Sequence, residues 1–210
     1  MKEIYKNLYQ FTLYIPNMDF TIHQYLYKSN PSILFAAGTV QQININMAEI
    51  KNILGERKLK YIFVSHMESD EAGGVFLLKN EFPDVNIICG QLSARELFGF
   101  GYDGKILPMN NDEYLNDGEL KLKFINYPSE VHLQNGLICF EENSGILYTS
   151  DLMLKFGNGE GKIINSNWHD EIKNACDNRI PVERAKILSE SLSKINPKFI
   201  AVGHGFCVKL

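Results

Sequence analysis

Residues 61–71 read YIFVSHMESDE. The first four of these residues are apolar, which is typical of a short strand buried on both faces of a sheet. The apolar spacing that follows predicts a helix over residues 71–80. His66, Glu68 and Asp70 therefore lie in a loop at the carboxyl end of a strand, which is a common position for a functional site in α/β proteins.

The rest of the chain continues this alternation of strands and helices. The expected strands cover residues 9–15, 25–27, 33–36, 85–89, 120–124, 137–140, 146–149 and 199–202, and the expected helices cover residues 48–54, 93–97 and 181–195. Runs of strands followed by alternating strands and helices favour an α/β sandwich over a helical bundle. Because no linker or internal repeat divides the 210 residues, we expect a single domain over residues 1–210.

Composition and charge exclude several classes of protein. The net charge is −4, from 21 basic and 25 acidic residues scattered along the chain, which argues against a nucleic-acid partner. No apolar run approaches the ~18 residues that a membrane span needs, so no membrane insertion is expected. The start of the sequence shows no secretory signal, and the four cysteines form no CxxC pair, so a cytoplasmic location is expected.

The polar loop of residues 65–71 is the first candidate site. His66, Glu68 and Asp70 alternate along it, so three side chains that can bind a metal leave one short turn. Carboxylates held this close repel one another unless a cation lies between them. The loop therefore predicts a metal site.

Three more residues can complete this site, because each stands just beyond an apolar run: His132, Asp151 and His204. Gly203 and Gly205 flank the last of these and permit a close approach of the backbone. Taken singly, each of the three is more often a hydrogen-bonded loop residue than a metal ligand. Together, and in this order, they indicate a metal centre.

The motif His66-x-Glu68-x-Asp70, followed by His132, Asp151 and His204, resembles the metallo-β-lactamase fold, and specifically the diiron domain of flavodiiron proteins. The separations after the first histidine are 66, 19 and 53 residues, and the resemblance covers about residues 11–208. It implies an αββα sandwich with the metal site at one edge of the two sheets.

The resemblance also implies a ligand set. One iron takes His66, Glu68 and His132, the other takes Asp70 and His204, and Asp151 bridges them. Zinc hydrolases of this fold usually have a second histidine where this chain has Glu68, and a carboxylate there favours iron over zinc. Such a site, with open positions, binds dioxygen or nitric oxide between two ferrous ions.

Two features depart from the flavodiiron pattern. Glu71 stands where those proteins usually have a histidine, and it is either a carboxylate ligand or an acid at a helix N-terminus, where the helix dipole favours it. The sequence also ends at Leu210, so no flavodoxin-like domain is expected. No phosphate-binding loop is visible, and residues 155–161 are expected to form a glycine-rich loop near the site, so no FMN is expected.

These departures favour an oxygen sensor or oxygen-binding protein. The chain is similar to stand-alone oxygen-binding diiron proteins associated with bacterial chemotaxis receptors, so a chemotaxis receptor is one expected partner. An oxygen or nitric oxide reductase fed by a separate redox partner is the alternative, and a hydrolase acting through a metal-bound hydroxide is a third possibility. His23, in the N-terminal region, is a candidate for supporting a metal ligand.

Overall fold

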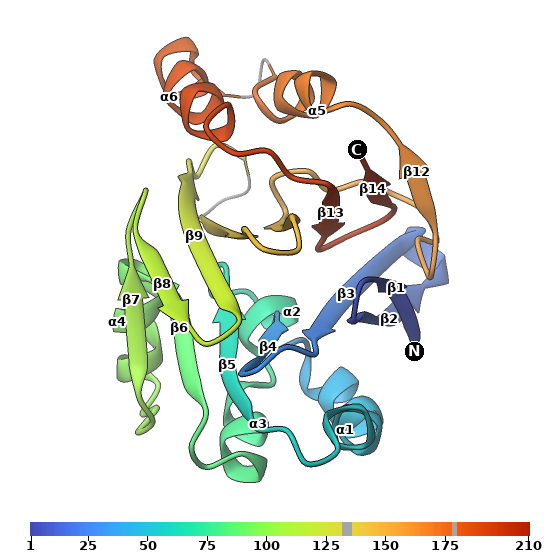
Figure 1. The fold of residues 1–210 in the computed structure, drawn as a ribbon, viewed down its shortest axis with the longest axis vertical. Helices are drawn as coiled ribbons and strands as arrows, with labels where there is room; N and C mark the ends of the chain where they lie inside the picture. The colour runs from blue at the N-terminus through green and yellow to red at the C-terminus, as the bar shows by residue number, and fades with distance from the viewer. Residues whose placement is uncertain (132–135, 178–179) are drawn as a thin grey trace.

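Two sheets form the centre of the computed structural model, which describes residues 1–131, 136–177 and 180–210 (Figure 1). In spatial order, the first sheet contains β1 (Lys2–Tyr5), β2 (Leu8–Ile15), β3 (Phe20–Tyr27), β4 (Ser32–Phe35), β5 (Leu59–Val64), β6 (Asn86–Gly90) and β7 (Ile106–Met109). The second contains β12 (Ile163–Asn165), β14 (Cys207–Lys209), β13 (Phe199–Val202), β11 (Ile146–Ser150), β10 (Gly136–Glu141), β9 (Leu120–Tyr127) and β8 (Tyr114–Asp117).

Helices lie on the outer faces of both sheets (Figure 1). They are α1 (Val40–Leu54), α2 (Ser69–Ala72), α3 (Val75–Glu81), α4 (Gln91–Gly99), α5 (Trp168–Ala175) and α6 (Val182–Leu192), and a short 3-10 turn, η1, covers Pro16–Met18. Apolar side chains of α1, α3 and α4 pack on the first sheet, and those of α5 and α6 pack on the second. The predicted αββα sandwich is therefore confirmed. No helix in the described ranges combines the length and apolar character that a membrane span requires.

The core between the sheets is rich in aromatic side chains. Phe35, Phe63 and Phe124 are fully buried there, and Tyr148 stacks on Phe35 with ring centroids 5.4 Å apart. Burying a side chain of this size contributes about 1.5–3 kcal/mol to folding. This packing holds the two sheets, and the loops at their edges, in a fixed relation.

Strand direction brings the functional loops to one edge. Strands β4, β5, β6 and β7 run parallel, as do β11 and β13 in the second sheet. Because parallel strands end at the same edge of a sheet, the loop after β11 and the loop after β13 emerge side by side. The loop after β5 meets them from the first sheet.

Helix α5 was not expected from the sequence, and two expected helices differ markedly from the prediction. Helix α1 begins at Val40, eight residues before the expected start, because Thr39 and Gln42 form a reciprocal capping box. The helix expected over residues 71–80 is two helices, α2 and α3, which are separated by Gly73 and Gly74. A side chain at Gly74 would overlap the carbonyl group of Ala37, so the chain needs glycine where it passes this neighbour.

Candidate metal centre

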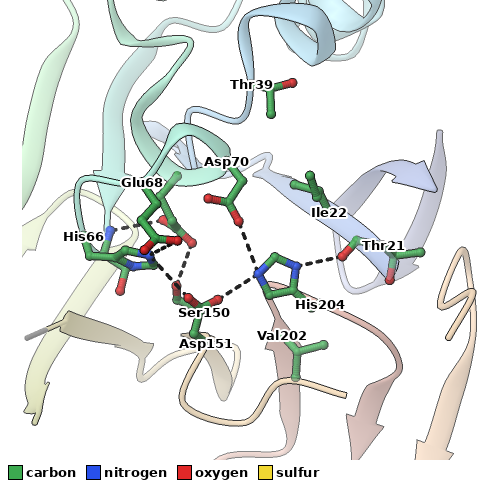
Figure 2. Close-up of polar contacts among 12 residues, drawn as sticks. Thr21, Ile22, Thr39, His66, Glu68, Asp70, Ser150, Asp151, Val202 and His204 are labelled. Carbon is green, nitrogen blue, oxygen red and sulfur yellow. Dashed lines mark hydrogen bonds and ion pairs between the residues drawn. The ribbon is translucent and has the colours of Figure 1, made fainter. Parts of the chain in front are cut away.

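Five of the six predicted ligands converge at one edge of the sandwich (Figure 2). His66 follows β5, and Glu68 and Asp70 lie where α2 begins, so these three come from the first sheet. Asp151 follows β11 and His204 follows β13, so these two come from the second. The sixth predicted ligand, His132, lies outside the described residues.

The five side chains form two groups that share Asp151. In the His66 group, the Nε2 atom of His66 lies 3.3 Å from Oδ2 of Asp151 and 3.8 Å from Oε2 of Glu68. In the His204 group, the Nε2 atom of His204 lies 2.8 Å from Oδ1 of Asp151 and 3.2 Å from Oδ2 of Asp70. Asp151 thus presents one carboxylate oxygen to each group, as a bridge between two metal ions requires.

The chemistry of these donors fits two divalent metal ions. Three carboxylates and two imidazoles meet here, and the side chains of His66, Asp151 and His204 are buried. Burial lowers the pKa of His204, but hydrogen bonds with Asp151 and Asp70 outweigh it and raise the pKa to about 10. The carboxylates therefore favour a positive charge at this position, which a metal ion supplies. A mixed set of imidazole and carboxylate donors suits iron.

Glu71 is buried and belongs to neither ligand group. One of its carboxylate oxygens accepts hydrogen bonds from the hydroxyl groups of Tyr148 and Ser150, the latter at 2.7 Å. The other oxygen accepts the backbone N–H of Ser65 at 3.2 Å. Burial raises the pKa of this carboxyl group. Of the two roles considered for Glu71, the structure supports the acid at a helix N-terminus, because Glu71 lies in the first turn of α2. Its hydrogen bonds also make it a brace between the loops that carry His66 and Asp151.

Backbone conformation at Ser150 also directs Asp151. Ser150 has a φ of 47°, in the left-handed region that few residues other than glycine adopt. The register between β11 and β13 shifts at the same point. The hydrogen bond from Ser150 to Glu71 offsets the energetic cost of this backbone conformation. The conformation turns the carboxylate of Asp151 toward the site.

Tyr127 supports the other histidine. Its hydroxyl group lies 3.4 Å from Nδ1 of His66 and 3.2 Å from Oγ of Ser65. Burial raises the pKa of Tyr127 well above its usual value, so the phenol keeps its proton. If Nε2 of His66 held a metal ion, its Nδ1–H could donate to the hydroxyl group of Tyr127. Sequence reasoning missed Tyr127, because only the fold brings β9 to the end of β5.

Known structures of similar fold include flavodiiron proteins. The flavodiiron core of Flv1 from Synechocystis has a TM-score of 0.77 and 18% identity, and covers 96% of this chain and 54% of that chain. Rubredoxin oxygen:oxidoreductase from Desulfovibrio gigas has a TM-score of 0.77 and 16% identity, and covers 99% of this chain and 57% of that chain. At these identities the comparison establishes a shared fold.

Sequence comparison reaches a curated relative and a family. Coenzyme F420H(2) oxidase of Methanothermobacter marburgensis is 21% identical over 117 residues, which cover 54% of this chain and 29% of the relative. The chain spans about a third of the length of the curated relatives it matches. A family model covers residues 20–205, nearly the whole sequence and every predicted ligand. The chain therefore belongs to the ODP family of beta lactamases.

Proposed function

We propose that this protein is a non-haem diiron protein that binds and reduces dioxygen or nitric oxide. The observation that carries the proposal is the sharing of Asp151 between two ligand groups, one of which contains the carboxylate of Glu68. A pair of ions joined by one carboxylate suits a reaction in which a small molecule is bound and reduced between two metals. The carboxylate at position 68 favours iron in that pair.

Each residue of the centre has a distinct role in this proposal. His66 and Glu68, with His132, would hold one ion, Asp70 and His204 would hold the other, and Asp151 would be shared by both. Two bound ferrous ions supply electrons and open coordination positions. The protein supplies burial, which excludes bulk water from His66, Asp151 and His204.

A groove beside one of the candidate ligands suits a small uncharged substrate. A groove of about 270 Å³ adjoins Glu68, whose side chain is 31% exposed and is the most open of the five ligands. Most of its lining is apolar, including Met67, Phe76, Leu97 and Phe100. A diatomic gas enters such a groove without a desolvation cost, whereas an anionic substrate would meet Glu68 and no basic side chain in the lining.

The names of two similar proteins support reduction. One is an oxidase of coenzyme F420H(2), and the other is a rubredoxin oxygen:oxidoreductase. By analogy, this chain receives electrons from a separate redox partner. Oxygen sensing through a chemotaxis receptor stays a prediction, since it depends on how long the site holds oxygen rather than on the fold.

A visible spectrum of anaerobic, iron-loaded protein, recorded before and after one equivalent of O₂ or NO, tests the proposal. We expect the ferrous protein to change its spectrum with either gas and, when given a chemical reductant, to consume several equivalents. A new band that persists for minutes without turnover would support oxygen binding and sensing instead. Zinc-loaded protein is the matched control, because zinc has no redox chemistry.

Two results would contradict the diiron proposal. One is a failure to take up two iron ions per chain. The other is a ferrous spectrum that neither gas alters. Hydrolysis of a thioester or phosphodiester by the zinc-loaded protein, together with either result, would instead establish the hydrolase.

A further inference from the structure

The loop that carries His204 is held by β3, although β3 belongs to the other sheet. The carbonyl oxygen of Thr21 accepts a hydrogen bond from Nδ1 of His204 at 2.7 Å (Figure 2). The hydroxyl oxygen of Thr21 accepts the backbone N–H of Gly205 at 2.8 Å. His23 donates its backbone N–H to Gly203 at 2.9 Å and lies, through Nε2, 2.8 Å from the carbonyl oxygen of Gly205. Four hydrogen bonds from two residues thus fix a three-residue loop.

The acceptors of these bonds define the proton positions on both histidines. A carbonyl oxygen can only accept, so His204 carries a proton on Nδ1 and turns Nε2 toward the carboxylates. By the same reasoning His23 carries its proton on Nε2, and its Nδ1 accepts from the hydroxyl group of Thr12 at 2.9 Å. Burial lowers the pKa of His23 to about 4, which is consistent with a neutral ring.

The opposite side of the same loop is also fixed. Gly203 donates its N–H to the carbonyl oxygen of Ser150 at 3.0 Å, and Lys155 donates its N–H to that of His204 at 3.1 Å. A side chain at Gly205 would overlap the backbone of Lys155. The segment of residues 150–155, which carries the bridging aspartate, and β3 therefore hold the loop between them. Displacement of β3 would change the separation of His204 from its carboxylate partners.

We propose that Thr21 and His23 are positioning residues for the metal ion of the His204 group, and that they do not act on the ion of the His66 group. The proposal rests on the proposed diiron centre. Their side-chain hydrogen bonds go to Gly205, Thr12 and Gly157, and none of these three residues belongs to the His66 group. Hydrogen bonds that orient a metal ligand typically change the affinity for the metal by about 10- to 100-fold.

Titration with Co²⁺ under argon, followed by absorbance, tests this proposal on the full chain. We expect the wild type to take up two ions, and Thr21→Val and His23→Leu to bind one of them about 10-fold or more weakly while the other keeps its affinity. Thr21→Ser and His23→Gln, which retain a hydrogen-bonding group, should restore most of the loss. Thr149→Val is the matched control: Thr149 is buried near Asp151, and its hydroxyl group has no partner among the described residues.

Two-bond ¹H–¹⁵N spectra of the zinc-loaded variants identify the weakened site. We expect the Nε2 signal of His204 to lose the shift that coordination causes, while that of His66 retains it. Equal weakening of both sites, or unchanged affinity in both variants, would overturn the proposal, and so would a wild type that binds fewer than two ions. If the affinities change as expected but the iron-loaded wild type ignores O₂ and NO, the positioning role stands and the proposed function fails.

Discussion

Asp151 gives one oxygen to each ligand group, so a single truncation removes a ligand from both. We expect Asp151→Ala to abolish binding of two ions, because the two carboxylate oxygens that face His66 and His204 are lost together. Metal content after dialysis, measured as ions per chain, checks this expectation. Asp84→Ala, which removes an exposed aspartate before β6, is the control and should retain both ions. Two ions per chain in Asp151→Ala would show that Asp151 is not the bridge.

Glu71 accepts hydrogen bonds from Ser65, Tyr148 and Ser150 in a fully buried position. Leaving a buried donor unsatisfied costs about 1–3 kcal/mol, so Glu71→Ala should lower the free energy of unfolding by about 3 kcal/mol or more. Glu71→Gln keeps an acceptor oxygen and should cost clearly less. Denaturant unfolding of the metal-free protein gives these values. The exposed Glu56 provides the control substitution, Glu56→Ala, which should stay within about 0.5 kcal/mol of wild type.

The proposed role of Glu71 as a brace would be wrong if Glu71→Ala and the wild type had the same denaturant midpoint of unfolding. If its stability were unchanged and it bound fewer metal ions, Glu71 would instead be the ligand that the resemblance to flavodiiron proteins leaves open.

His66, Asp151 and His204 were candidates from sequence because each stands just beyond an apolar run, and Glu68 and Asp70 because they share the loop after the first of these runs. These five side chains meet in the structure. Their supporting residues were not predictable in this way. Glu71 contacts Tyr148 and Ser150, which are 77 and 79 residues away, so no local pattern links them. His23 is the exception, since the sequence offered it as a support for a metal ligand, but its contact with Gly205 spans 182 residues and the partner could not be predicted.

At the scale of elements, Thr39 controls the start of α1. Its hydroxyl oxygen accepts the N–H of Gln42 at 3.1 Å, and the side chain of Gln42 accepts the N–H of Thr39 at 3.0 Å. We expect Thr39→Ala to lower stability by about 1 kcal/mol, which is typical of the loss of an N-cap. Thermal unfolding measures the difference. Gln41→Ala, an exposed substitution one residue away from Gln42, should leave stability nearly unchanged, and an equal loss in both variants would contradict the capping role.

Comparison of the predicted and observed strands shows which sequence patterns are sufficient to locate a strand. Short apolar strands such as β5 and β13 were predicted closely, because four or more consecutive apolar residues leave few alternatives. Strand β3 was underestimated, since buried Thr21, His23 and Gln24 interrupt its apolar pattern. These polar residues can be buried because they hydrogen-bond to other segments. The same residues interrupt the apolar pattern from which the full length of the strand would have been predicted.

For the whole molecule, the αββα architecture followed from the alternation of elements together with the resemblance to flavodiiron proteins. The placement of the two sheets relative to each other could not be predicted from any one motif. It matters for function because His66, Glu68 and Asp70 extend from the first sheet, whereas Asp151 and His204 extend from the second. The glycine-rich run of residues 155–161 contacts segments from both sheets. Gly159 lies directly against Gly205, which follows β13, and Gly157 donates its N–H to Asp19, which precedes β3.

Metal ions at this edge would therefore join the two sheets, and their binding should stabilise the whole fold. A ligand present at 100 times its dissociation constant adds about 2.7 kcal/mol per site to the free energy of unfolding, if it does not bind the unfolded chain. We expect Zn²⁺ to raise the thermal midpoint of wild-type protein in steps that match the two sites, and a chelator to reverse the rise. Asp151→Ala should show neither step, because its carboxylate belongs to both groups. A midpoint that zinc leaves unchanged in the wild type would mean that the two sheets are held together by the aromatic core alone, with no contribution from the centre.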